Sequence, residues 1–468
     1  MLTYFPQYFT SKAIYCYLAL LIVVPLTFGY PMEWYFWIFG VVEVIGFFYF
    51  TNKFTVRWQG YSSEKFQKKV FWTSFVIRVV YVLFSYWFYT TMTGEPFEYS
   101  TADAWNYHDS ACYGADMITG GKTWAYFYLV HGADISDSGY ITYLIVNYLL
   151  FGKSILMARL VKAFLLAMIC VLVYRLASRN FGERTGRMAA IFCMLMPNLI
   201  YYCGLHLKEA EMVFLTVLFI ERADWMLRGE KIKFWPMTLV AVIGLSLFTF
   251  RTVLGGVAFL SLFTAIVFTS KRVMGWGKKI LVGTLALGFL FMAMSDSIIS
   301  EVSTLWKNRD SNQKTSMEWR TKRKGGNEFA KYAGASVFAP MIFTIPFPTM
   351  VATEGQENQR LIHGGNYVKN ITSFFTILAL FMLVFSGQWR QHVLLLSFTL
   401  GYLAVITMSA FAHSERFHLP VLPFALILAA YGVSQMQNKH KRWYMIWLGI
   451  IFVANIAWAW FKLRGRGL

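Results

Sequence analysis

Long apolar runs of membrane-spanning length repeat along almost the whole chain. Each holds about 17 to 25 residues, the length that an α-helix needs to cross the hydrocarbon core of a bilayer. Of the 468 residues, 57% are hydrophobic and 14% are charged, against roughly 25% charged in an ordinary soluble domain. These features exclude a soluble globule and predict an all-α polytopic membrane protein with about 13 transmembrane helices, within a range of about 12 to 14.

The predicted spans follow the apolar runs closely. They cover residues 13–30, 34–50, 70–92, 154–178, 187–203, 209–227, 234–250, 252–270, 279–295, 370–386, 392–412, 417–436 and 443–461. The first run is not followed by a small-residue cleavage site, so we expect an uncleaved span. The run at residues 140–151 is too short for an upright helix, and we expect it to lie at the membrane interface.

The charge balance predicts orientation rather than nucleic-acid binding. The chain has 43 Lys and Arg against 24 Asp and Glu, a net charge of +19, and 20 of the basic residues fall in alternate loops. The positive-inside rule places those loops in the cytoplasm. Two outer stretches disagree, because the loop at 296–369 is basic and the tail carries Lys462, Arg464 and Arg466.

Two substantial outer loops, residues 93–139 and 296–369, are where we expect function. The first carries seven acidic residues and one lysine. Its segment after Thr101 reads as a surface helix with Asp103 in the first turn, and at about 100° per residue Asp103 and Tyr107 share a face. Asp103 could act as a general base towards a hydroxyl, or it could only favour the helix dipole.

The second outer loop is basic and interrupted by prolines. Arg320 lies close to the basic residues 322–324 and to Gly325 and Gly326, which predicts either phosphate binding or a solvated basic loop beside lipid headgroups. The apolar stretch at 333–350 contains prolines and cannot form an undistorted span. It could instead form a wall for a lipid chain.

No cofactor or metal is indicated. The five cysteines form no CxxC pair, the eight histidines show no metal-ligand spacing, and no GxxxxGK[ST] motif occurs. We therefore expect neither a zinc site nor an ATP-driven transporter subunit. Charged and histidine side chains gather instead at the outer helix junctions: His206, Lys208 and Glu209, and then His413, Glu415, Arg416 and His418.

An ordered series of residues resembles the GT-C superfamily of polytopic glycosyltransferases, especially the branch with the aminoarabinose transferase of lipid A and the protein O-mannosyltransferases. The resemblance covers roughly residues 70–436. It is carried by Asp103 with Tyr107 and Ala111, Gly120-Gly121, Trp124, residues 139–143, Phe151-Gly152, Arg159, residues 174–182, Pro197, Lys208-Glu209, residues 415–423 and residues 429–432. Two departures are Ala104, where the family often has a second acid, and residues 137–140, which replace a Pro-Pro run.

The resemblance implies a division of the chain. Residues 1–69 would be an N-terminal two-helix addition, and residues 70–295 the GT-C-like catalytic module that includes outer loop 93–139. Residues 296–369 would form the second outer loop, and residues 370–468 the C-terminal helices.

The implied activity is inverting transfer of a sugar from a polyprenyl-phosphate donor to an acceptor hydroxyl, on the outer face of a bacterial inner membrane. Asp103 would be the base, with Tyr107, His108 and Asp109 as secondary candidates on the acceptor side. Because the leaving group is already a phosphate, no cofactor is required, and a divalent metal is compatible but not indicated. The candidates for binding the donor phosphate are Lys208, Arg416, His363, Arg251 and Arg320, with Glu209, His206, His413 and Glu415 in support.

The acceptor stays open between a glycan, a lipid and a protein. A second reading is a polysaccharide polymerase or ligase of the O-antigen type, which would give polymerised or block-transferred products. A third is a lipid-linked glycan flippase or other transporter, which two inverted halves would favour. No such halves are visible in the sequence.

Overall fold

The computed structural model describes residues 2–126, 136–229, 234–268, 309–322, 326–409 and 411–468. Across these ranges the secondary structure is helical, without β-strands. The part of the chain up to residue 268 contains α1 (Gln7–Phe28), α2 (Trp34–Arg57), α3 (Ser63–Thr93), α4 (Asp103–Thr119), α6 (Ser138–Phe151), α7 (Ile155–Phe181), α8 (Glu183–Leu195), α9 (Pro197–Tyr201), η1 (Tyr202–Gly204), α10 (Glu209–Arg228), α11 (Phe234–Phe250) and α12 (Thr252–Phe268).

The C-terminal part begins with short elements and ends with long helices. It contains α15 (Arg309–Lys322), η2 (Glu328–Tyr332), α16 (Ala335–Phe338), η3 (Ala339–Met341), α17 (Glu357–Leu361), α18 (His363–Phe385), η4 (Gln388–His392), α19 (Val393–Thr407), α20 (Glu415–His418), η5 (Leu419–Val421), α21 (Leu422–Ser434) and α22 (Asn438–Arg464).

The predicted polytopic, all-helical class is confirmed. In the described part of the chain, seven helical stretches are long and apolar enough to cross a membrane, namely α1, α2, α3, α7, α18, Glu415–Ser434 and α22. The shorter α11 covers the predicted run at 234–250, and α12 covers the described part, 252–268, of the predicted run at 252–270. The predicted span at 279–295 lies outside the described residues, and so does the boundary of the predicted module at 295. The division into modules therefore stays a prediction.

One predicted span, residues 187–203, is broken into separate pieces. Helix α8 ends at Leu195, and α9 begins at Pro197. Proline has no backbone N–H and its ring clashes with the preceding turn, so it favours the start of a helix and kinks or breaks a helix when it lies inside one. A short 3-10 turn then leads to the junction at His206 and Lys208.

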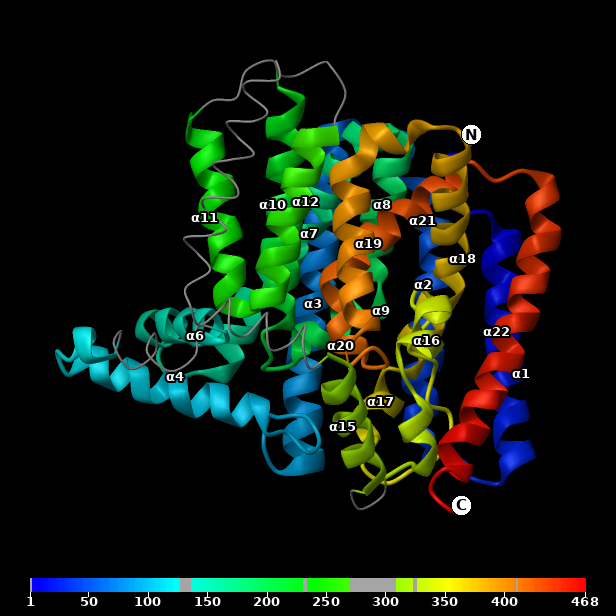
Figure 1. Cartoon of the computed structure of the whole chain (residues 1–468), viewed down its shortest axis with the longest axis horizontal. Coiled ribbons are helices and arrows are strands. Elements are labelled where there is room, and N and C mark those ends of the chain that lie inside the picture. The colour runs from blue at the N-terminus through cyan, green and yellow to red at the C-terminus, as the bar shows by residue number, and fades with distance from the viewer. Residues whose placement is uncertain (1, 127–135, 230–233, 269–308, 323–325, 410) are drawn as a thin grey trace.

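The long helices form one upright bundle, and α4 and α6 lie across its lower end in Figure 1. Helix α7 packs against α3, α8 and α10, while α18 packs against α21 and α2. Helix α1 contacts both α2 and the C-terminal α22. Because α15, α17 and the C-terminus lie at the same end as α4 (Figure 1), segments distant in sequence meet there.

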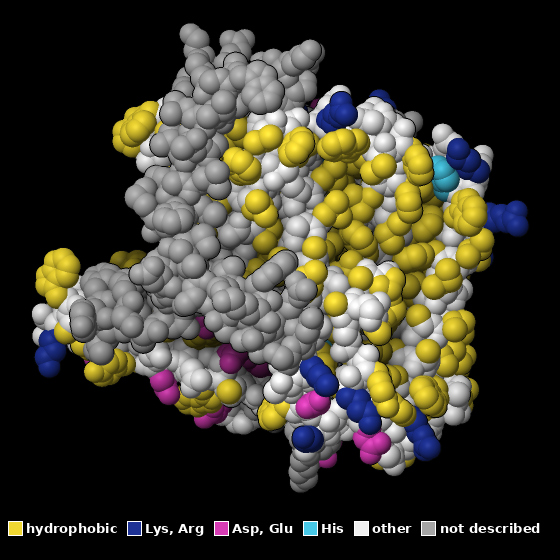
Figure 2. All heavy atoms as spheres, in the orientation of Figure 1, with side chains coloured by type: hydrophobic (Ala, Val, Ile, Leu, Met, Phe, Trp, Pro, Cys, Tyr) yellow, Lys and Arg dark blue, Asp and Glu magenta, His cyan; other side chains and the backbone are white. Residues whose placement is uncertain are grey.

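The surface in Figure 2 shows a broad belt of hydrophobic side chains across the middle of the visible face. Lysine and arginine side chains lie above and below this belt, and acidic side chains gather toward the lower end. A bilayer-spanning protein needs this distribution, because a charged side chain in contact with hydrocarbon is costly.

Candidate active site

Asp103 is the first residue of α4 and carries one end of a three-member ion cluster. The Nη2 atom of Arg416 donates to Oδ2 of Asp103 at 2.7 Å, and its Nε atom donates to Oε1 of Glu209 at 2.9 Å. Arg416 therefore links α4, the start of α10 and α20. The side chain of Asp103 is 46% exposed, whereas that of Glu209 is fully buried.

A second charged group, centred on Lys208, adjoins this cluster. The Lys208 ammonium forms an ion pair with Asp137 and donates to the carbonyl of Phe250 at 3.0 Å. Tyr107 donates its hydroxyl to Oδ2 of Asp137 at 3.1 Å. Burial and the nearby Arg251 guanidinium lower the pKa of Lys208 to about 8. The predicted shared face of Asp103 and Tyr107 thus contacts one continuous set of charges.

A polar cavity of about 350 Å³ opens beside Asp103. Three carboxylates, from Glu98, Asp103 and Glu415, line it together with Arg416. Burial raises the pKa of Glu98. The other lining residues are Tyr99, Ser100, Thr101, Ala102, Tyr201, Tyr202, Leu205, Leu207, Gly355, Gln356, Asn358 and Gln359. Hydroxyl, amide and carboxylate groups around a sugar-sized space suit a ligand rich in hydroxyls.

A second cavity of about 570 Å³ has a different character. Its walls are mainly apolar and come from the segment at 329–347 and from α22. The predicted Pro-interrupted stretch at 333–350 contributes Ala333, Val337, Phe338, Met341, Ile345, Pro346 and Phe347. The apolar wall expected from the sequence at 333–350 therefore lines this cavity.

The two cavities adjoin at Gln356 and Gln359, which line both. Gln356 precedes the short helix α17, and Gln359 lies within it. The Lys462 ammonium, at the end of α22, donates to Oε1 of each glutamine at 2.9 Å. Asn358 of the same helix donates to the carbonyl of Tyr99 at 2.8 Å, so α17 connects the first outer loop to α22.

Several predicted site residues meet at these cavities. Asp103, Arg416 and Glu415 line the polar cavity, and Glu209 holds Arg416. Arg320 and His413 line the apolar cavity, where the Arg320 guanidinium donates to the His413 ring. Residues 323–325, which belong to the predicted basic phosphate loop, lie outside the described residues.

Arg251 and Lys208 lie next to the ion cluster rather than in the cavity walls. The guanidinium of Arg251 lies over the ring of Phe417, 4.3 Å from its centroid. Neither residue is among the described lining residues of the two cavities. Both add positive charge close to Glu209, since they act electrostatically on its carboxylate.

His363 is a correction to the predicted phosphate-binding set. Its ring is fully buried, with Nε2 2.8 Å from the hydroxyl of Tyr17 and Nδ1 2.6 Å from the carbonyl of Arg360. Both ring nitrogens are therefore engaged within the protein, and His363 is absent from the described walls of both cavities. It fixes α18 against α1 and α17 instead.

His108, His206 and Asp109 also lie away from the ion cluster. His108 and His206 both contact the hydroxyl of Tyr148, at 2.7 and 3.2 Å, and burial lowers the pKa of each ring. Asp109 lies on the exposed face of α4. Within the described ranges, no three His, Cys, Asp or Glu side chains form a group that could hold a metal ion.

The sequence analysis missed Asp137, Glu98, Gln356, Gln359 and Lys462 as site residues. Asp137 lies in the segment at 137–140, where the chain departs from the family pattern, and this departure could have identified it as a site residue. Lys462 had a second signal, because its positive charge on the outer side breaks the positive-inside rule. Nothing in the sequence distinguishes the two glutamines.

The fold and site define a polytopic membrane protein with an aspartate-bearing helix across one end of a helical bundle (Figure 1) and adjoining polar and apolar cavities. A model of the Alg9-like mannosyltransferase family matches residues 358–463, less than a quarter of the chain. This match supports a membrane glycosyltransferase of the GT-C superfamily.

Among solved structures, one match is the archaeal oligosaccharyltransferase AglB from Archaeoglobus fulgidus, in complex with an inhibitory peptide and a dolichol-phosphate. The two are 12% identical, with a TM-score of 0.42, and the match covers 88% of this chain. The chain spans about half of that protein's length, 56%. A search of curated proteins gives no match.

Proposed function

We propose that this protein is an inverting glycosyltransferase that moves a sugar from a polyprenyl-phosphate donor to an acceptor hydroxyl. The observation that carries the proposal is the pair of adjoining cavities. One is polar and holds a half-exposed aspartate, and the other is apolar with basic residues in its wall. A lipid-linked sugar has the same two parts, a hydroxyl-rich head and a long apolar chain.

Asp103 is the proposed base. The acceptor oxygen attacks the anomeric carbon, the bond from that carbon to the phosphate oxygen breaks, and the lipid phosphate leaves with the electron pair. The acceptor proton passes to the Asp103 carboxylate. A positioned base contributes typically about 10²- to 10⁴-fold to such a step.

The cations near Asp103 have two proposed roles. Arg416 holds the Asp103 carboxylate at 2.7 Å and so fixes its orientation at the cavity. Lys208 and Arg251 lie next to the same cluster but outside the cavity walls. They stabilise the negative charge that develops on the phosphate through longer-range electrostatics rather than direct contact. Arg320 and His413 would act from the apolar cavity.

We place this site on the outer face of a bacterial inner membrane. The basis is the positive-inside rule, since the loops with 20 basic residues alternate with the segments that carry Asp103, Lys208 and Arg416. The acceptor could be a glycan, a lipid or a protein, and the open side of α4 leaves room for any of them.

The test is transfer by Asp103→Asn, measured with purified protein, a radiolabelled polyprenyl-phosphate sugar and membrane extract as the acceptor source. We expect a loss of about 10²- to 10⁴-fold, with unchanged insertion and thermal unfolding. Asp116→Asn is the matched control, because Asp116 lies on the same helix but pairs with the exposed Lys153. Wild-type transfer by Asp103→Asn would refute the assignment.

The product separates the proposed reaction from polymerisation. Mass spectrometry of a deletion strain should show accumulation of a polyprenyl phosphate that carries a single sugar. An unpolymerised repeat on a polyprenyl pyrophosphate would point to a polymerase or ligase instead.

A further inference from the structure

Apart from Tyr332, the titratable side chains that line the apolar cavity are all basic or histidine. They are Arg320, His413, Lys462 and Arg466, and no aspartate or glutamate occurs among the lining residues that the structure describes. The rest of the wall includes Phe329, Phe347 and Trp458. Such a cavity suits a molecule with a long apolar body and an anionic end, because the body removes apolar surface from water and the anion offsets the cost of the buried cations.

Lys462 lies where the anionic end of such a molecule would have to be. Its side chain is only 6% exposed, and its ammonium donates to Oε1 of both Gln356 and Gln359 at 2.9 Å. These two glutamines line both cavities. The ammonium is therefore at the boundary between the apolar cavity and the polar cavity that contains Asp103.

Hydrogen bonds fix the orientation of the side-chain amides of Gln356 and Gln359. The hydroxyl of Thr353 donates to Oε1 of Gln356 at 3.0 Å, and that of Thr349 donates to Oε1 of Gln359 at 3.5 Å. Each amide oxygen thus accepts from Lys462 and from a threonine. The amide NH₂ groups are donors only, so the junction combines an ammonium with amide donors, a set that matches the oxygens of a phosphate.

We propose that Lys462, Gln356 and Gln359 form the binding subsite for the phosphate of the lipid-linked donor. This inference rests on the proposed function and names a part of the site that family resemblance and sequence did not assign. With the phosphate at the junction, the isoprenoid chain occupies the apolar cavity and the sugar enters the polar cavity towards Asp103. The phosphate group itself is the feature recognised, so a phospholipid headgroup is the competing ligand.

The experiment measures binding of three probes to the full-length protein in nanodiscs: a polyprenyl phosphate, the polyprenol of the same chain length, and phosphatidylglycerol. We expect Lys462→Gln to weaken polyprenyl phosphate about 10- to 100-fold, the effect of losing a hydrogen bond to a charged group. Polyprenol binding should not change. Lys462→Arg should retain most of the affinity, and Arg464→Gln, an exposed cation two residues away on α22, should behave like wild type.

A second variant guards against a folding defect. Gln359→Glu is isosteric and keeps an oxygen that can accept from Lys462, but it places negative charge at the junction. We expect it to weaken polyprenyl phosphate at least tenfold without changing polyprenol binding, because like charges repel strongly in a partly buried site.

The other outcomes separate three claims: the phosphate subsite, the identity of its ligand and the proposed function. Unchanged affinity for polyprenyl phosphate in both Lys462→Gln and Gln359→Glu would overturn the subsite. Equal wild-type affinity for phosphatidylglycerol, with equal loss in the variants, would overturn it as a donor subsite and assign it to bulk lipid. Absence of polyprenyl-phosphate binding to the wild type would instead overturn the proposed function. Asp103→Asn, which tests that function, should bind polyprenyl phosphate like wild type.

Discussion

Two arginine clusters at opposite ends of α10 use the same ion-pair chemistry. At the start of the helix, Arg416 bonds to Glu209 at 2.9 Å and to Asp103 at 2.7 Å. Near its end, Arg179 bonds to Glu221 at 2.8 Å and to Asp224 at 3.0 Å. The two arginine side chains are almost equally exposed, at 27% and 25%. Judged by the arginine alone, the clusters are indistinguishable.

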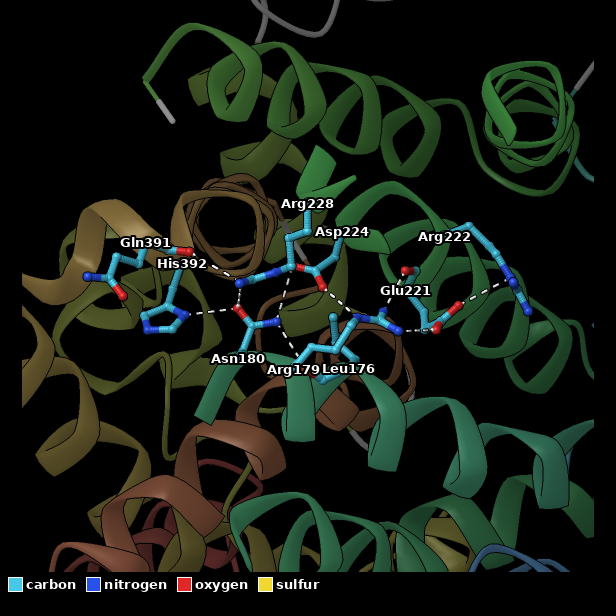
Figure 3. A network of polar contacts seen from close by, with 9 residues as sticks. All are labelled: Leu176, Arg179, Asn180, Glu221, Arg222, Asp224, Arg228, Gln391 and His392. Carbon is cyan, nitrogen blue, oxygen red and sulfur yellow. Dashed lines mark hydrogen bonds and ion pairs between the residues drawn. The ribbon is translucent and has the colours of Figure 1, made fainter. Parts of the chain in front are cut away.

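The clusters differ in what surrounds their carboxylates. Glu221 and Asp224 are 2% and 9% exposed, and Figure 3 shows Asp224 receiving further bonds from Asn180 and Arg228. His392 also contacts Asn180, so the network joins α7, α10 and η4, which directly precedes α19. Asp103 is instead 46% exposed and faces a cavity. A carboxylate saturated by protein donors holds helices together, whereas one that keeps access to a cavity is available to a substrate.

Between the two clusters, the largest expected effect comes from removing each arginine in turn. Arg416→Gln should lose stability by about 3 kcal/mol, because it leaves the buried Glu209 without its ion-pair partner. Arg179→Gln should lose less stability, because Glu221 keeps Arg222 and Asp224 keeps Arg228. Only Arg416→Gln should lose transfer activity per folded molecule, by about 10- to 100-fold, since Asp103 then loses its orientation. Thermal unfolding of purified protein, combined with transfer rates normalised to the folded fraction, measures both effects.

The proposed difference between the two clusters would be wrong if Arg416→Gln and Arg179→Gln had the same activity per folded molecule. A comparable loss of activity per folded molecule in Arg179→Gln would mean that the network in Figure 3 supports catalysis. Full activity in Arg416→Gln would mean that Asp103 needs no fixed orientation.

A smaller effect is expected from pH, through Lys208. Its ordinary pKa is about 10.4, and the folded protein lowers this pKa to about 8 through burial and the cation of Arg251. Above pH 8 the ammonium loses its proton, so donor affinity should fall, by up to about tenfold per pH unit. Between pH 8 and about 10 the unfolded chain binds the proton more tightly than the folded protein does, so this group makes stability rise with pH.

Activity and stability should therefore move in opposite directions through Lys208 on the alkaline side. KM for the donor measured from pH 7 to 9.5, beside thermal unfolding over the same range, tests this. Lys208→Arg keeps its charge at these pH values and should move the rise in KM to higher pH. If the pH dependence of KM in Lys208→Arg were the same as in wild type, Lys208 would not be the cation that binds the donor electrostatically.

Much of the fold followed from the sequence because hydrocarbon thickness fixes the length of an apolar helix. The run at 234–250 has the same bounds as α11, and the short run at 140–151 forms α6, beside α4 at one end of the bundle (Figure 1). The predicted span at 187–203 is wrong for a local reason, because Pro197 ends α8 and starts α9 within an otherwise apolar run. Helix breaks depend on one residue, and hydropathy averages over many.

The site was predictable as a set of residues and not as a set of contacts. Asp103 and Arg416 are 313 positions apart, and no local pattern specifies that they meet. His363 shows the opposite error: a histidine beside two glycines looked available for a ligand, but burial engaged both of its nitrogens. The two exceptions to the positive-inside rule were the best unused signal, because Arg320, Lys462 and Arg466 all line the apolar cavity.

The smallest expected effect separates Asp103 from its neighbour Asp109. Both are aspartates on α4 and both were candidates from sequence, but Asp109 lies on the exposed face and Asp103 bonds to Arg416. Asp109→Asn should therefore keep transfer activity within about twofold of wild type and change stability by no more than about 0.5 kcal/mol, as surface substitutions usually do. A loss of activity comparable with that of Asp103→Asn would mean that the acceptor approaches over the exposed face of α4, and that access to the cavity is not what distinguishes the catalytic aspartate.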